Sequence, residues 1–176
     1  MAQEDQPLWL DIVLYYVLAH AGLRIGELLD LWIQDLDLHA RRLVIREGKG
    51  RKDRIVYLTD TAAQALVAYL HTVPPARGDL VFSIQQMPLS YHQALGRLRK
   101  LANSVDILNL SPLRLRHTYA TTLLNNGMTI DALRQLMGHS HLNTTLIYAR
   151  LADSTVEHQY QSAMNHLDLF RLSNSM

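Results

Sequence analysis

The 176-residue sequence contains no cysteine, so neither disulfide bonds nor a cysteine-ligated zinc ribbon can hold the fold together. No uninterrupted apolar run approaches the length of a membrane-spanning helix. The first seven residues are polar and acidic, unlike a secretory signal, and no internal repeat follows them. We therefore expect a cytoplasmic protein without a membrane partner, long enough for one domain with a buried core.

A strong charge of either sign is also missing, because the net charge is only +1, which by itself argues weakly against a nucleic-acid partner. The basic residues are nevertheless unevenly spread. Residues 41–54 hold seven lysines and arginines against two acids, and further basic residues recur in 97–100 and 114–117. A near-neutral total can conceal one cationic face, and such a face is suited to binding phosphates.

Apolar residues recur at helical spacing along most of the chain, whereas the segment after Leu31 has the pattern of short strands. The predicted helices cover approximately residues 8–20, 24–31, 60–73, 90–101, 113–125, 129–137, 143–148 and 156–167. Gly22 and Gly138 are expected to end helices, and Thr59 or Asp60, Ser90 and Thr129 are expected to begin them. Strands are predicted at 32–33, 43–45 and 55–58, with one short extended piece at 80–82. The fold class is therefore mainly α (α+β), with a small three-stranded antiparallel sheet.

Two arginines occupy positions where an unpaired positive charge costs free energy, so each is expected to have a hydrogen-bonding or charged partner. Arg24 is placed in the first turn of a helix, where the helix dipole disfavours a cation by about 0.3–1 kcal/mol. Either Glu27, one turn along, pairs with it, or a phosphate completes the site. Arg116 lies at the edge of an apolar helix face, where an unpaired charge is costly. It either bonds backbone carbonyls at the edge of the core or uses its planar fork to bind a phosphate.

Three further residue types have both an ordinary and a functional interpretation. Lys49, at the tip of a Gly-Lys-Gly turn, is either a solvated lysine or a mobile ammonium that reaches a leaving oxygen. Tyr148, near the end of a short helix capped by Asn143, is either a core residue or a reactive phenol. His139 and His141 do not share a helix face, and no carboxylate or thiolate lies beside them, so a metal site is disfavoured.

Together, four segments resemble the motifs of the tyrosine recombinases, also called phage integrases. Their order and spacing agree with that family, and the resemblance covers about residues 9 to 150. The four segments are the first arginine motif at 21–28, the lysine turn at 47–54, the second arginine motif at 115–121, and the histidine and tyrosine motifs at 137–148. The resemblance implies a helical DNA breaking-rejoining catalytic domain over residues 1–150 and a C-terminal helical tail over 151–176.

The resemblance also implies a mechanism for this site. Tyr148 would attack a DNA phosphodiester and form a 3′-phosphotyrosyl link, while Arg24 and Arg116 stabilise the added negative charge. Lys49 would protonate the departing 5′ oxygen as general acid, and His139 would bond the phosphate or orient the tyrosine. The 5′-hydroxyl of another strand would then complete the exchange, so neither a metal nor another cofactor is implied.

The partners implied by the resemblance are double-stranded DNA and further copies of the protein, as a tetramer on DNA and associated with the nucleoid. We expect Arg51, Lys52, Arg54 and Arg114 to contact DNA. Relatives carry an N-terminal core-binding domain that closes around DNA and is absent from this chain, so we expect a fragment of a longer recombinase. The C-terminal tail would pack either on its own core or on a neighbouring subunit.

Leu113 departs from the family pattern, which usually has a histidine three residues before the second arginine. Leucine cannot donate, accept or transfer a proton, and losing one transition-state hydrogen bond costs about 10²–10³ in rate. The protein is therefore slower, or Arg114 or His117 substitutes, or this copy is degenerate. Two alternative functions follow: a DNA-binding relative without catalysis, and a DNA-relaxing activity like that of type IB topoisomerases.

Overall fold

The computed structural model describes residues 7–46, 53–73 and 79–138, which fall into two compact units. The first unit ends at Tyr119 and the second begins at Ala120. Each unit is considered by itself. The helices predicted at 143–148 and 156–167 lie outside the described residues. In the described part of the chain, no helix is long and apolar enough to cross a membrane.

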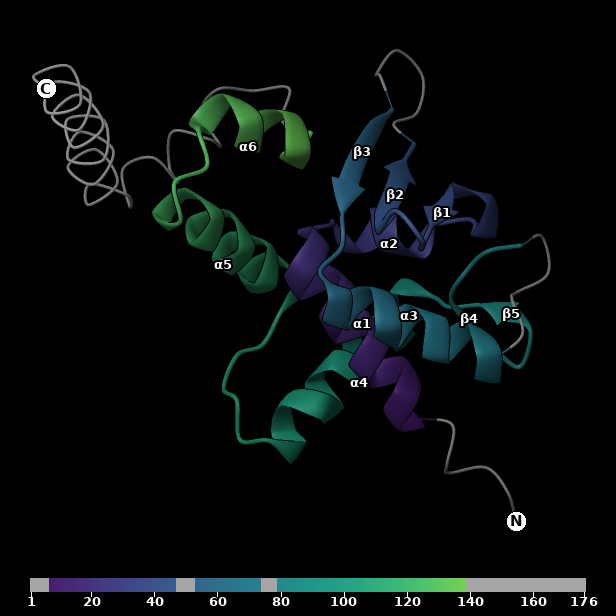
Figure 1. Ribbon diagram of the computed structural model, residues 1–176. Helices are drawn as coiled ribbons and strands as arrows, with labels where there is room; N and C mark the ends of the chain where they lie inside the picture. The colour runs from purple at the N-terminus through teal and green to yellow at the C-terminus, as the bar shows by residue number, and fades with distance from the viewer. Residues whose placement is uncertain (1–6, 47–52, 74–78, 139–176) are drawn as a thin grey trace, which may run out of the picture. The chain divides into compact units, whose positions relative to one another are not determined.

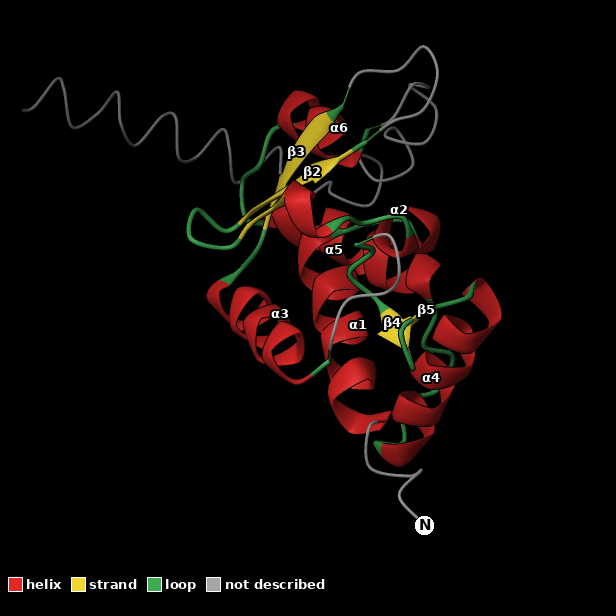
Figure 2. Cartoon of the chain, turned by 90° about the vertical axis from the view of Figure 1, so that its right-hand side faces the viewer, coloured by secondary structure: helices red, strands yellow, loops and turns green. Residues whose placement is uncertain are grey.

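Helix α1 (Pro7–Ala21) is the central helix of the first unit. It packs against α3 (Asp60–Thr72) and α4 (Tyr91–Ser104), which lie on opposite sides of it (Figure 2). Because it is covered on two sides, α1 is apolar around most of its circumference. Its buried hydrophobic residues are Leu10, Val13, Leu14, Val17, Leu18 and Ala21. Buried Asp11 also accepts a 2.8 Å hydrogen bond from Arg97, which ties α1 to α4.

Local signals set the helix ends, as predicted. Gly22 ends α1 in the left-handed region, with φ of +62°. The hydroxyl of Thr59 caps α3 by accepting a 3.3 Å hydrogen bond from the backbone N–H of Ala62. Ser90 and Gln93 form a reciprocal capping box at the start of α4, with hydrogen bonds of 3.3 and 2.9 Å.

The predicted antiparallel sheet is confirmed, and it lies at one end of the three packed helices (Figure 1). Its strands, in the spatial order β1-β2-β3, are β1 (Leu36–Asp37), β2 (Arg42–Ile45) and β3 (Arg54–Tyr57). Leu43 and Val56 face each other across β2 and β3 and are both fully buried. Alternate residues of these strands therefore anchor the sheet in the core.

The first strand was predicted in the wrong place. Residues 33–35 form a short 3-10 helix, η1 (Ile33–Asp35), and β1 begins immediately after it. The backbone N–H of Ile33 donates to the carbonyl of Asp79 at 2.9 Å, and Trp32 forms an isolated bridge with Leu80. Because these backbone groups already pair with a distant loop, they are not available to β2.

The extended piece predicted at 80–82 forms that bridge, and the backbone N–H of Val81 donates to the carbonyl of Leu31 at 2.9 Å. The chain then forms a small hairpin from β4 (Ser83–Ile84) and β5 (Met87–Pro88). The remaining helices are α2 (Ile25–Leu29), α5 (Pro112–Asn125), which spans the boundary between the units, and α6 (Ile130–Met137). Thr129 caps α6 and Gly138 ends it with φ of +63°, both as predicted.

Candidate functional site

Arg24 is the N-cap residue of α2, and its partner is Glu27. The backbone N–H of Arg24 donates to Oε2 of Glu27 at 2.8 Å, and its Nη1 donates to Oε1 at 2.6 Å. A carboxylate that reaches back to the N-cap amide is a common way to satisfy the free donors of a helix start. The predicted ion pair is therefore present, while 44% of the Arg24 side chain stays exposed. The guanidinium thus remains accessible to an anion.

Arg116 reaches the same carboxylate from α5. Its Nη1 donates to the backbone carbonyl of Gly22 and lies 3.9 Å from Oε2 of Glu27. Its side chain is only 6% exposed. The predicted bond from a core-edge arginine to a backbone carbonyl is therefore observed, and it holds the guanidinium beside the turn that carries Arg24.

Arg54, the first residue of β3, completes the group. Its Nη2 donates to Oε2 of Glu27 at 2.8 Å, and its side chain is 8% exposed. We call Arg24, Glu27, Arg54 and Arg116 the Glu27 cluster. Its members come from the start of α2, the sheet and α5, which are far apart in the sequence. The four side chains carry three positive charges and one negative charge, a sum of +2, which favours binding of an anion.

The carboxyl group of Glu27 is ionised despite its position. Burial opposes ionisation, but hydrogen bonds and charge from Arg54 and Arg24 outweigh it and lower the pKa of Glu27 below its usual value. An ionised carboxylate accepts several donors at once, and it can therefore orient more than one guanidinium.

The turn that carries Arg24 is fixed against α5 by a close contact that the sequence analysis did not identify. A Cβ atom added to Gly22 would lie 2.2 Å from Cδ1 of Tyr119, so only glycine fits beneath this ring. Burial raises the pKa of Tyr119 to about 12, which keeps its phenol neutral. Tyr119 therefore packs against the turn and is not an ionised nucleophile. Gly22 lies in the first arginine motif and Tyr119 in the second. Only a spacing conserved between these two distant motifs could have indicated their contact in advance.

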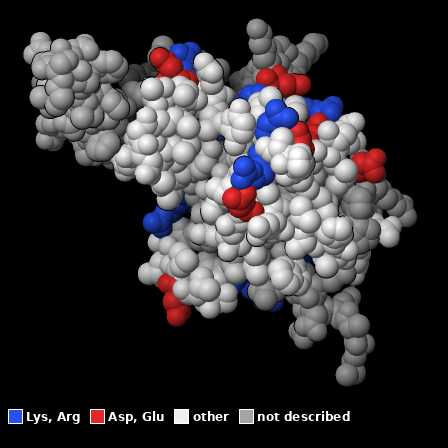
Figure 3. Space-filling model, in the orientation of Figure 1, with Lys and Arg blue, Asp and Glu red and all other residues white. Residues whose placement is uncertain are grey.

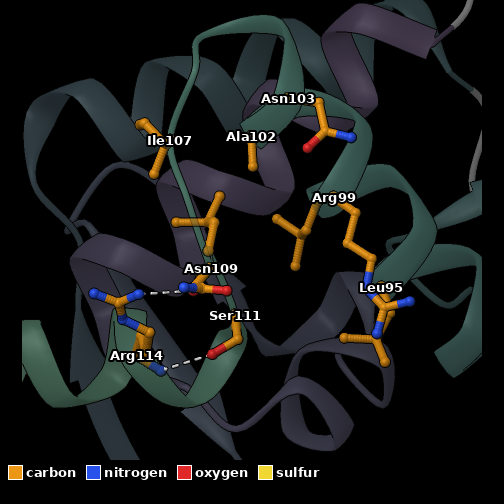
Figure 4. A pocket seen from close by; sticks show the side chains of 10 residues that line it. Leu95, Arg99, Ala102, Asn103, Ile107, Asn109, Ser111 and Arg114 are labelled. Carbon is orange, nitrogen blue, oxygen red and sulfur yellow. Dashed lines mark hydrogen bonds between the residues drawn. The ribbon is translucent and has the colours of Figure 1, made fainter.

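Leu113 and Arg114 occupy the first turn of α5. Leu113 is 73% exposed, so its side chain adds little to the core. The guanidinium of Arg114 donates to the carbonyls of Leu108 and Asn109 at 3.3 and 3.2 Å, which fixes the loop before α5. Arg114 also lines a pocket of about 510 Å³ between α4 and the start of α5, together with Arg99 (Figure 4).

The other predicted site residues, Lys49, Arg51, Lys52, His139 and Tyr148, lie outside the described residues, and their roles stay predictions.

The described part of the basic segment 41–54 is more nearly balanced in charge than its sequence suggests. Arg42 pairs with Asp37 at 2.7 Å, and Arg41 pairs with Asp60. Arg46 pairs with buried Asp35 at 2.6 Å. Basic and acidic side chains accordingly alternate over the sheet on the face shown in Figure 3. The described part of this segment therefore presents paired arginines rather than a continuous cationic surface.

Comparison with known proteins identifies the family of this chain. A model of the phage integrase family matches residues 2–155. The chain belongs to the phage integrase family. The family resemblance inferred from the four motifs is thereby confirmed, and the Glu27 cluster contains the arginines of both its arginine motifs.

Relatives and solved structures of phage integrases extend the match. Tyrosine recombinase XerA of Thermococcus onnurineus is 35% identical over 151 residues, which cover 84% of this chain and 52% of the relative. Tyrosine recombinase XerD of Staphylococcus saprophyticus is 31% identical over 157 residues, covering 85% of this chain and 53% of the relative. The chain thus spans about half the length of these curated relatives.

A crystal structure of XerA recombinase is 32% identical and superposes with a TM-score of 0.74, covering 92% of this chain and 64% of that one. The Tn1549 transposon integrase, solved in complex with a circular intermediate DNA, is 26% identical with a TM-score of 0.65, covering 78% of this chain and 52% of that one. The mainly helical fold with a small antiparallel sheet is therefore the fold of this family.

Proposed function

We propose that this chain is the catalytic domain of a site-specific DNA recombinase that cuts and rejoins DNA through Tyr148. The observation that carries the proposal is the convergence of Arg24 and Arg116 on one carboxylate. Two guanidiniums held side by side, one exposed and one buried, are suited to bind two oxygens of one phosphate. Membership of the phage integrase family supports assigning that phosphate to DNA.

In the first step, the phenol oxygen of Tyr148 attacks the phosphorus of a DNA phosphodiester. The bond between phosphorus and the 5′ oxygen breaks, Lys49 donates a proton to that oxygen, and the phenolic proton of Tyr148 is released to solvent. The products are a 3′-phosphotyrosyl link and a free 5′-hydroxyl. Arg24 and Arg116 hydrogen-bond the non-bridging oxygens, where negative charge accumulates in the transition state. His139 bonds the same phosphate or orients Tyr148.

In the second step, the 5′-hydroxyl of a partner strand attacks the phosphotyrosyl phosphorus. The bond to the phenol oxygen breaks, the proton of the attacking hydroxyl returns to Lys49, and Tyr148 regains a proton from solvent. The number of phosphodiester bonds is unchanged, so the cycle needs no external energy source. The protein domain contributes positioning and charge stabilisation, because Glu27 holds Arg24 and the carbonyl of Gly22 holds Arg116 through both steps.

We further propose that double-stranded DNA is bound by several copies of the protein together, as a tetramer. The Tn1549 transposon integrase in complex with a circular intermediate DNA supports a DNA partner. Arg51, Lys52 and Arg114 are the proposed DNA contacts. Because this chain corresponds to about half of its relatives, we expect it to bind DNA weakly by itself, with a steep dependence on salt.

Covalent trapping tests the proposed function. Duplexes taken from the DNA that flanks the gene would carry a bridging sulfur at the 5′ position of each candidate cleavage site, so that cleavage releases a thiol that cannot religate. We expect a protein–DNA adduct on a denaturing gel, and no adduct with Tyr148→Phe. An adduct that persists in Tyr148→Phe would refute the assigned nucleophile.

One observation favours a second candidate, a DNA-binding relative without catalysis. Position 113, where the family usually has a histidine, holds an exposed leucine. Under this alternative the chain binds the flanking duplexes but forms no adduct with any of them. Relaxation of a supercoiled plasmid that lacks the flanking sequences would instead indicate a topoisomerase-like activity.

A further inference from the structure

Arg54 has a different environment from the exposed arginines of the sheet. Its side chain is 8% exposed, whereas 46% of Arg42 and 52% of Arg46 are exposed. A side chain that contacts a DNA phosphate has to reach the surface. Arg54 instead directs its Nη2 to Oε2 of Glu27 at 2.8 Å. Its position therefore favours a role inside the Glu27 cluster over the predicted contact with DNA.

The two oxygens of Glu27 are divided among the arginines. Oε1 accepts from the side chain of Arg24, while Oε2 accepts from the Arg24 amide and from Arg54. Arg116 is also nearest to Oε2, but at 3.9 Å, which is beyond hydrogen-bonding distance. Arg54 thus takes the position on Oε2 that Arg116 would otherwise be able to approach.

This division has a consequence for phosphate binding. A guanidinium hydrogen-bonded to a carboxylate has part of its charge neutralised and some of its donors occupied. Arg54 donates a hydrogen bond to Oε2 of Glu27. The carboxylate can therefore hold Arg24 through Oε1 without also forming a short hydrogen bond to Arg116. Small displacements of groups that bind the transition state are expensive, since a shift of about 1 Å can cost about 10²-fold in rate.

We infer that Arg54 is a positioning residue, which saturates Glu27 and thereby orients Arg24 and keeps Arg116 directed toward the phosphate. It acts through Glu27 and does not itself contact DNA. The inference rests on the proposed function for its catalytic consequence, but its structural part concerns anion binding and can be tested separately.

The first test separates positioning from DNA contact. Arg54→Gln removes the charge, Arg54→Lys retains it without the planar fork, and Arg42→Gln is the matched control, an exposed paired arginine of the neighbouring strand. Binding of the full chain to a duplex of arbitrary sequence is measured as a function of salt. We expect Arg54→Gln to retain the wild-type slope of log K against log salt. A slope smaller by about 0.9 would overturn the inference, because that is the loss expected for one phosphate contact.

The second test measures the rate of adduct formation on the sulfur-containing duplexes at saturating DNA. We expect Arg54→Gln to lower this rate by about 10²-fold, with partial recovery in Arg54→Lys and the wild-type rate in Arg42→Gln. Glu27→Gln should have a similar effect, and the double variant should be no slower than the worse single variant. A wild-type rate in Arg54→Gln, or additive losses, would overturn the inference.

The third test does not depend on catalysis. Inorganic phosphate is titrated into the full chain while the Nε–Hε signals of Arg24 and Arg116 are followed by ¹⁵N NMR. We expect a weaker response in Arg54→Gln than in Arg42→Gln, and an equal response would overturn the inference. If the wild type forms no adduct, the proposed function fails while this test still decides the positioning role. Should Arg54→Gln not fold by circular dichroism, the same three measurements on Arg54→Lys decide it.

Discussion

Replacing Gly22 by alanine is expected to destabilise the first unit strongly. Gly22 has φ of +62°, and a left-handed conformation costs a residue with a Cβ about 1–2 kcal/mol. The added Cβ would also lie 2.2 Å from Cδ1 and 2.5 Å from Cε1 of Tyr119. Overpacking of this kind costs about 1–3 kcal/mol, so the free energy of unfolding should fall by roughly 2–5 kcal/mol in all.

Three further variants separate these causes. In Gly22→Ala/Tyr119→Ala the ring is removed, so the clash should disappear and only the backbone cost of about 1–2 kcal/mol should remain relative to Tyr119→Ala. Gly96→Ala is the matched control, because a Cβ at this position in α4 meets no atom within 4 Å. It should be more stable than wild type by about 0.5–1 kcal/mol, since alanine is the better helix former.

Urea unfolding followed by circular dichroism measures all four free energies. A Gly22→Ala variant within about 0.5 kcal/mol of wild type would refute the reasoning, since only sites without strain or close packing behave in this way. The carbonyl of Gly22 also accepts a hydrogen bond from Arg116, so a shift of this turn should move the guanidinium. We therefore expect the Arg116 Nε–Hε signal to change in Gly22→Ala and to stay the same in Gly96→Ala.

Three other predictions follow from the same structure. Leu113→His should speed adduct formation by up to about 10²-fold, because histidine can form the hydrogen bond that leucine cannot. It should not lower stability, because position 113 is exposed. The control variant, Leu113→Phe, should leave the rate unchanged. Because the pKa of Tyr119 is about 12 when folded and ordinarily 10, its contribution to stability is complete below pH 10 and lost as the pH rises toward 12. Between pH 10 and pH 12, the free energy of unfolding of Tyr119→Phe should depend less on pH than that of wild type. Arg97→Met leaves buried Asp11 unpaired and should cost about 3–5 kcal/mol in urea unfolding, whereas the double variant Asp11→Leu/Arg97→Met should recover most of this loss.

Under the proposed function, the Glu27 cluster would allow an exposed and a buried arginine to act on the same phosphate. Arg24 is available to solvent, while Arg116 is held by a backbone carbonyl and lies near the shared carboxylate. Neither arginine has to be brought to Glu27 when an anion arrives, so little of the binding energy is lost to ordering them. This is the property that phosphoryl transfer most requires of the protein.

Features that depend on neighbouring residues could be predicted from the sequence. The helix ends at Gly22, Thr59, Ser90 and Thr129 were predicted correctly, because a cap or a left-handed glycine acts within one turn of its own helix. The family was also recognisable, since its motifs are short and lie in a fixed order. Pairing of Arg24 with Glu27 was one of the two alternatives that the sequence left open, because the two residues are one turn apart.

Features in which distant segments compete for the same groups could not be predicted and are seen first in the folded structure. Trp32 has the pattern of a strand residue, but its neighbour Ile33 bonds to a loop more than forty residues away, and β1 begins later. Arg54 looks like a DNA contact in a basic segment, yet folding buries it against Glu27. The contact of Gly22 with Tyr119 joins two motifs that are separated by most of the first unit. Such pairings depend on where the whole chain places each group, and local sequence patterns carry no information about that placement.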